Sequence, residues 1–91
     1  MNHDLFDTRA VRSNGKRLHF GVIVRAGVSA EEAILYAYDW LASIDINRSD
    51  ITSIDNHFCH NAISSTQIRS LLNHQNYAII KSKGCPGYYL E

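Results

Sequence analysis

The dipeptide Asn14-Gly15 separates two segments with strand-like patterns, and this arrangement constrains the fold more than any other feature of the chain. Both central residues of a type I′ turn need positive φ, and an Asn-Gly pair adopts that conformation readily. After the turn, apolar residues recur with period two from Leu18 to Val24, as in a strand with one buried face. The sequence therefore predicts a β-hairpin with strands at about residues 5–12 and 17–24.

Two serines mark the starts of predicted helices. Ser29 lies three residues before Glu32, and Ser64 lies three residues before Gln67, which is the spacing of a capping box. Apolar residues follow each serine at helical spacing, as expected for helices with one buried face. The predicted helices span about residues 29–44 and 64–72.

Two further strands, at about residues 51–60 and 77–80, complete the predicted order ββαβαβ and give an α+β fold class. Two amphipathic helices and four short strands favour a two-layer sandwich, with both helices packed on one face of a mainly antiparallel four-stranded sheet. Phe20, Trp40 and Phe58 are in phase with apolar neighbours, so we expect them in the core.

The length of 91 residues suits one domain with a modest core and leaves no room for a second domain. We expect residues 1–91 to form a single domain, with its core over about 5–85 and a flexible tail at 86–91. Leu90-Glu91, at the end of this tail, resembles the scar of a purification tag.

Nine basic and nine acidic residues give a formal net charge of zero, so no global field favours nucleic acid or anionic lipid. No apolar run is long enough to span a membrane, and the N-terminus lacks the features of a signal peptide. Two cysteines without such a signal indicate a reducing compartment, so we expect a cytoplasmic location. The expected partner is a protein or a small ligand, and the expected state is a monomer or a weak homodimer.

Both cysteines and two histidines fall in two short segments, which makes these segments the strongest candidate for a chemical site. His57, Cys59 and His60 lie in the first segment, and Cys85 lies in the second. Thiolate and imidazole bind soft metals, and a structural zinc site takes four such ligands. Cys59, His60 and Cys85 would supply three ligands to zinc. The fourth would be His57, His19 or a water molecule.

Neighbours such as Cys59 and His60 point to opposite faces of a regular strand, so both bind one ion only where the strand ends or bulges. Two other interpretations stay open. In one, Cys59 packs as a small apolar residue and His60 lines the strand end. In the other, Cys59 and Cys85 form a reactive thiol pair, which requires their α-carbons to lie within about 7 Å.

Charge is unevenly distributed along the chain, which gives a second candidate surface. Residues 1–25 carry five basic and two acidic groups, whereas residues 26–55 carry one basic and six acidic groups. A basic hairpin beside an acidic helix can steer a partner, and His19 and Arg17 are the candidate contact residues. Two solvated faces of a small domain would give the same pattern.

Several short motifs occur in a characteristic order: Asp7-Thr8, Gly15, Leu18–Val22, Trp40–Ile44, Phe58–His60, Asn76-Tyr77 with Ile79, and Gly84-Cys85. Together they resemble a small bacterial family catalogued as domain of unknown function 2024, from about Phe6 to Cys85 with almost no gaps. The resemblance implies a small α/β domain with two helices on a mainly antiparallel sheet. It implies no established activity.

The chain departs from this family pattern at two positions. Asn56 stands where the family typically has a cysteine, and Gly21 stands where it tends to have an acidic residue. The resemblance implies a metal set of three thiolates and one imidazole. This chain keeps Cys59, His60 and Cys85 of that set and lacks the fourth ligand.

The sequence contains no complete catalytic pattern, because a nucleophile elbow and a glycine-rich phosphate loop are both missing. The function is therefore not assigned by sequence, and the leading hypothesis is a small non-catalytic binding or interaction module. The alternative hypothesis is a zinc-type or reactive-thiol site built on Cys59, His60 and Cys85.

Overall fold

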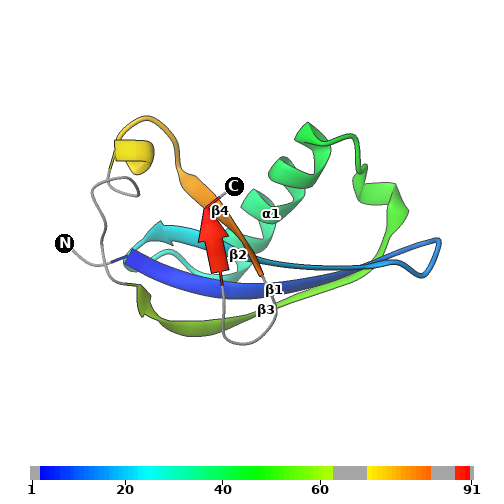
Figure 1. Ribbon diagram of the computed structural model, residues 1–91, viewed down its shortest axis with the longest axis horizontal. Helices are drawn as coiled ribbons and strands as arrows, with labels where there is room; N and C mark the ends of the chain where they lie inside the picture. Colours follow the sequence, from blue (N-terminus) through cyan, green and yellow to red (C-terminus); the bar gives the residue numbers. More distant parts are fainter. Residues whose placement is uncertain (1–2, 63–69, 83–87, 91) are drawn as a thin grey trace.

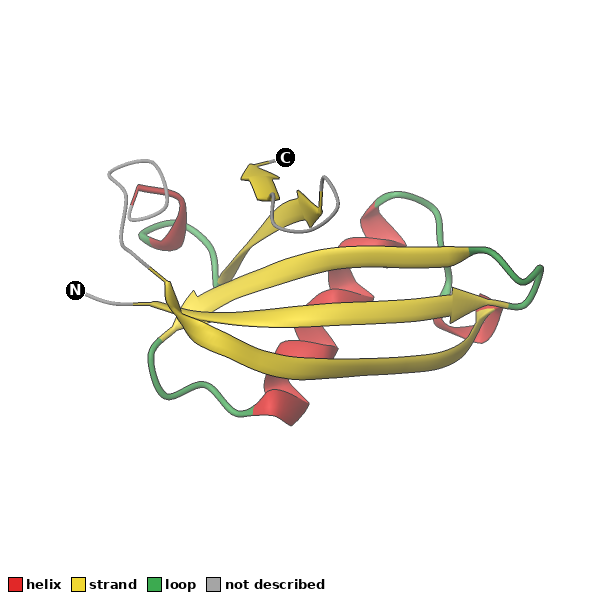
Figure 2. Cartoon of the chain, turned by 60° about the horizontal axis from the view of Figure 1, so that its bottom comes forward, coloured by secondary structure: helices red, strands yellow, loops and turns green. Residues whose placement is uncertain are grey.

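The computed structural model describes residues 3–62, 70–82 and 88–90, which form a twisted sheet with a helix across one face (Figures 1 and 2). The strand order is β3-β1-β2-β4-β5, and every neighbouring pair is antiparallel. The α+β fold class with an antiparallel sheet is therefore confirmed. The elements are β1 (His3–Arg12), β2 (Arg17–Arg25), α1 (Ala30–Ser43), the 3-10 turn η1 (Arg48–Asp50), β3 (Ile51–Ala62), β4 (Tyr77–Ser82) and β5 (Tyr88–Leu90).

The hairpin and α1 form where the sequence predicts them, because both depend on local interactions. Gly15 has a φ of 85°, and the Asn14 side chain accepts a hydrogen bond from the Lys16 amide at 3.0 Å. Asn14 itself does not have a positive φ, so the prediction of a type I′ turn is wrong: the Gly15 amide donates to the Arg12 carbonyl oxygen, and only the glycine takes the left-handed conformation. At the start of α1, the Ser29 hydroxyl accepts a hydrogen bond from the Glu32 amide at 3.1 Å. No helix in the described part of the chain is long and apolar enough to cross a membrane.

Strand β2 is buried on both of its faces. Phe20, Val22 and Val24 pack with the buried side of α1. Ile23 packs on the opposite side of the sheet, in a second cluster that includes Leu5. We call these two sides the α1 face and the outer face.

The second helical segment packs on the outer face, which corrects the prediction that both helices share one face. Residues 70–72 are helical, and Leu72 is part of the outer cluster. Because β2 and β4 carry apolar side chains on both faces, the sheet needs a cover on each side. Residues 63–69, where the sequence predicts the start of this helix, lie outside the described residues. The buried members of the outer cluster are Leu5, Ile23, Leu72, Ala78 and Ile80.

Strand β5 extends the sheet within the segment where the sequence predicts a flexible tail. It pairs antiparallel with Ile80–Ser82 of β4. Aromatic residues such as Tyr88 and Tyr89 favour strands, and the edge of β4 offers unpaired backbone groups, which accounts for the added strand. Residues 83–87 and 91 lie outside the described residues.

The three aromatic residues predicted in the core differ in their environments. Phe20 is 1% exposed, and its ring lies 4.7 Å from the ring of Trp40 between centroids. Phe58 is 54% exposed, so the prediction of a core position is wrong for this residue. It makes an edge contact with Phe6, but β3 is the last strand of the sheet and has no neighbour beyond it among the described strands.

Gly21 lies on the outer face in close contact with two neighbouring strands. A Cβ built at this position would lie 2.8 Å from Leu5 Cδ1 and 2.8 Å from Ile80 Cγ1. Any larger residue, including the acidic one that the family resemblance implies, therefore requires both side chains to move.

Gly21→Ala should lower the free energy of unfolding by about 1–3 kcal/mol, because the added methyl group overpacks the outer cluster. Urea unfolding measures the change. Ser53→Ala, at an exposed position of β3, is the control and should change stability by less than about 0.5 kcal/mol. An unchanged midpoint for Gly21→Ala would show that Leu5 and Ile80 move aside without cost.

Asp50 ties the hairpin turn to the start of β3. Its carboxylate accepts hydrogen bonds from the Ser13 hydroxyl and from Arg12 Nε, the latter at 2.8 Å. These bonds, first from Ser13 and then from Arg12, hold the pKa of Asp50 below its usual value of 3.8. A carboxyl whose pKa is lowered on folding stabilises the fold above its unfolded pKa, and the stabilisation is lost as pH falls through the folded pKa.

Asp50→Asn should therefore destabilise the protein at about pH 7 and have a much smaller effect at about pH 2. Denaturation midpoints of the wild type and the variant at both pH values give the comparison. An equal loss of stability at the two pH values would contradict a contribution from the ionised carboxylate.

Candidate functional site

Two of the predicted metal residues lie at exposed positions of β3, an edge strand of the sheet. The His57 side chain is 73% exposed, with Nε2 3.7 Å from Asp55 Oδ1. Cys59 is an exposed free cysteine. The interpretation of Cys59 as a small packed core residue is therefore wrong, and its thiol is open to solvent.

The pairing of β3 with β1 is irregular at the predicted metal residues. Phe58 and His60 pair with consecutive residues of β1, so Cys59 is an extra residue in β3, as in a β-bulge. Cys59 and His60 can bind one ion only where the strand ends or bulges, and this irregular pairing provides such a bulge. Cys85 and the His60 side chain lie outside the described positions. Among the side chains that are described, no three His, Cys, Asp or Glu residues gather closely enough to hold a metal ion.

His19 and Arg17, the second candidate pair, line one depression of about 360 Å³ near the hairpin turn. Asp7 Oδ1 lies 2.5 Å from His19 Nε2, and Asp7 Oδ2 lies 3.7 Å from Arg9 Nε. Arg9 and Asp55 also line the depression. The structure thus brings the two predicted residues together, but carboxylates beside them offset the positive charge, and exposed ion pairs contribute little free energy.

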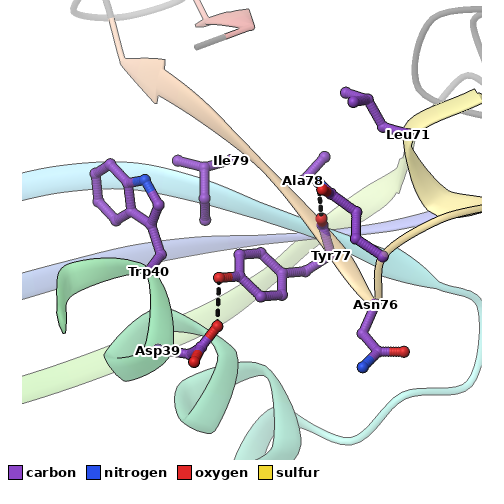
Figure 3. A pocket seen from close by; sticks show the side chains of 8 residues that line it. Asp39, Trp40, Leu71, Asn76, Tyr77, Ala78 and Ile79 are labelled. Atoms are coloured by element: carbon purple, nitrogen blue, oxygen red, sulfur yellow. Dashed lines mark hydrogen bonds between the residues drawn. The ribbon is translucent and has the colours of Figure 1, made fainter. Parts of the chain in front are cut away.

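A larger groove lies between α1 and β4, and no sequence pattern anticipates it (Figure 3). Its volume is about 550 Å³. Side chains of α1 form one wall, β4 forms the floor, and the segment before β4 forms the opposite wall. We call this site the α1–β4 groove, and its lining residues are Asp39 and Trp40, Leu71, Gln75 and Asn76, and Tyr77–Ile79.

The Tyr77 hydroxyl ties β4 to α1 inside this groove. It donates a hydrogen bond to Asp39 Oδ2 at 2.7 Å, and the Tyr77 ring stacks on Tyr36 with the centroids 5.3 Å apart. Burial, and then the bond to Asp39, raise the pKa of Tyr77, so the phenol stays protonated at neutral pH. Tyr36 donates a hydrogen bond to Glu32 at 2.7 Å, which raises the pKa of Tyr36 as well. These contacts hold the Asp39 carboxylate in the groove.

The groove combines apolar walls with a few polar groups, as ligand sites commonly do. Trp40, Leu71 and Ile79 supply apolar surface, and Gln75 Nε2 donates a hydrogen bond to the Tyr77 carbonyl oxygen at 2.6 Å (Figure 3). Asp39 is the only charged side chain among the described lining residues. A carboxylate beside an aromatic ring favours a ligand that carries a positive charge.

The sequence does not predict the groove, because the groove forms only when β4 lies beside α1, and strand order is not visible in the sequence pattern. Sequence spacing assigns Trp40 to the core and places Tyr36 on the polar side of the helix. The one available signal was this surface tyrosine, because Tyr36 stacks on Tyr77 at the groove.

In the native protein the Cys59 thiol should react rapidly with Ellman's reagent, and Cys59→Ser should lower the number of rapidly reacting thiols by one, because Cys59 is exposed. The same variant should unfold within about 0.5 kcal/mol of the wild type. Cys85→Ser, which keeps Cys59, is the matched control. A Cys59 thiol that reacts only after addition of a chelator would contradict this expectation and indicate a bound metal.

Comparison with known proteins shows a family and a similar structure. A search of curated proteins finds no match. The NMR structure of protein NE1680 from Nitrosomonas europaea, a structural genomics target, is similar with a TM-score of 0.76 and 28% sequence identity, covering 93% of this chain and 99% of that chain. The family model described as Domain of unknown function (DUF2024) matches residues 1–82. The chain therefore belongs to this DUF2024 family.

Proposed function

We propose that this protein is a non-catalytic binding module and that the α1–β4 groove is its ligand site. The observation that carries the proposal is the meeting of the Asp39 carboxylate with aromatic and apolar walls in a groove of about 550 Å³. This volume falls within the range of about 300–1,000 Å³ that is typical of small-ligand sites. The ligand class that fits this lining is an organic cation.

Each polar group of the groove has a role in this proposal. Asp39 supplies the negative charge, and the Tyr77 hydroxyl bonded to it fixes the carboxylate in place. Trp40 offers an aromatic ring to a cation. Gln75 and Asn76 offer carboxamide groups that donate and accept hydrogen bonds on the opposite wall. None of the described lining residues is basic, so no lining charge offsets Asp39.

The alternative function is a zinc-type or reactive-thiol site at Cys59, His60 and Cys85, with His57 assisting. The irregular pairing of β3 at Cys59 and the exposure of its thiol support this alternative. It requires Cys85 and the imidazole of His60 to approach Cys59. The thiol titration of Cys59 separates the two functions, because a bound metal protects its thiolate ligands.

Three further expectations belong to the proposal. The protein acts in the cytoplasm, where an exposed free thiol such as that of Cys59 stays reduced. Its partner is a protein or a small ligand rather than nucleic acid, which its net charge of zero supports. The ββαβαβ order includes a second helix over about residues 64–72, which the helical residues 70–72 support.

Benzylamine should change the fluorescence of Trp40, the single tryptophan of the chain, in a saturable titration, because Trp40 lines the groove. Asp39→Asn should weaken binding about two- to fivefold, since an exposed ion pair contributes about 0.5–1 kcal/mol. Benzyl alcohol, which has the same shape without the charge, is the ligand control.

Asp55→Asn, which removes a carboxylate from the other edge of the sheet, is the protein control and should leave benzylamine affinity unchanged. Equal affinities for the Asp39→Asn and Asp55→Asn variants would reject the groove as the ligand site. So would NMR shifts confined to the depression at His19 and Arg17.

A further inference from the structure

Among the described residues, a strand pairs with only half of the β4 edge that faces away from β2. β5 pairs with Ile80–Ser82, whereas Tyr77–Ile79 have no strand neighbour on that side among the described residues. The inner edge of the same three residues pairs with Val22–Val24 of β2. An uncovered strand edge presents backbone N–H and C=O groups that pair with an added strand.

The α1–β4 groove follows this uncovered edge. Tyr77–Ile79 line it, with Asp39 and Trp40 on one side and the segment before β4 on the other (Figure 3). Three residues of extended chain span about 10 Å, so a short strand can lie along this floor between the two walls.

Gln75 shows that this edge accepts a hydrogen bond from the groove. Its Nε2 donates to the Tyr77 carbonyl oxygen at 2.6 Å, and Gln75 itself lines the groove. The carboxamide therefore occupies the place that the amide N–H of an added strand would take. Because Gln75 is exposed, an incoming strand can displace its side chain into solvent.

The alternation of side chains along β4 sets what an added strand must carry. Tyr77 and Ile79 pack on the α1 face, whereas Ala78 packs in the outer cluster with Leu71. Alternate side chains of an added strand therefore point toward Asp39 and Trp40, and the side chains between them point toward Ala78. The first set suits lysine or arginine, and the second suits a small apolar residue.

A second copy of this chain fits the groove less well than a basic partner. The other edge of the sheet is β3, whose 12 residues include Asp55 and no lysine or arginine. Pairing β3 of a second copy with the β4 edge would bring a carboxylate, and no cation, to Asp39. Charge complementarity therefore points to a peptide from a different protein.

We infer that the α1–β4 groove binds an extended basic peptide of a partner protein, which adds a strand beside Tyr77–Ile79 in line with β5. This inference rests on the proposed function, because it names the ligand class of the same groove. Main-chain pairing with the β4 edge supplies affinity, and the basic side chains at Asp39 supply selectivity.

The probe is the peptide acetyl-Lys-Val-Lys-Val-Lys-amide, titrated into the full chain while Trp40 fluorescence and backbone amide exchange are recorded. We expect saturable binding and slower hydrogen exchange of the Tyr77 and Ile79 amides, because backbone groups alternate between the two edges of β4 and those of Tyr77 and Ile79 face the groove. The same peptide with N-methyl groups on its three central residues should bind at least about tenfold more weakly, because it has lost the donors that pair with β4. The peptide with glutamate in place of lysine should bind more weakly than the probe.

Three outcomes would overturn the inference, and they separate it from the proposed function. Equal affinity of the methylated peptide, together with saturable benzylamine binding, would leave the groove as a cation site without strand addition. No response of Trp40 to either benzylamine or the probe would overturn both proposals. Exchange protection along β3, with none at residues 77–79, would place the peptide on the other edge of the sheet.

Discussion

Five consecutive residues of β2, Phe20–Val24, are buried, and this burial on two faces is the constraint on which the rest of the structure depends. A strand buried on both faces needs an apolar cover on each. α1 supplies one cover, and the turn that carries Leu72 supplies part of the other. The burial of β2 also explains the glycine at position 21, because a side chain there would clash with Leu5 and Ile80.

The two covers also shape the α1–β4 groove. β4 pairs with β2, so α1 lies on one side of it and the segment that carries Leu72 lies on the other. Among the described residues, β5 pairs with only the second half of the β4 edge, and Tyr77–Ile79 lie at the floor between the two walls. The groove is therefore a consequence of how β2 is buried, and its chemistry comes from Asp39 and Trp40 on the wall that α1 provides.

The sequence predicts those parts of the fold that depend on neighbouring residues. The tight turn at Asn14-Gly15 and the capped start of α1 each depend on interactions within a few residues, and the structure confirms the position of both, although the turn is not of type I′. The face of the second helical segment and the exposure of Phe58 depend on strand order, which alternation within one strand does not encode. The same distinction between local and long-range contacts separates the candidate site that the sequence predicts from the one that it does not. The predicted pair at the hairpin lies on one strand, whereas the groove joins Asp39 to Tyr77 across 38 residues.

The most direct test of the groove as the ligand site is a crystal structure of the chain saturated with the lysine-valine peptide. We predict a peptide backbone that runs beside Tyr77–Ile79 in line with β5, with a lysine side chain at Asp39. A peptide bound along β3, or on the outer face at His19 and Arg17, would contradict this account of the site.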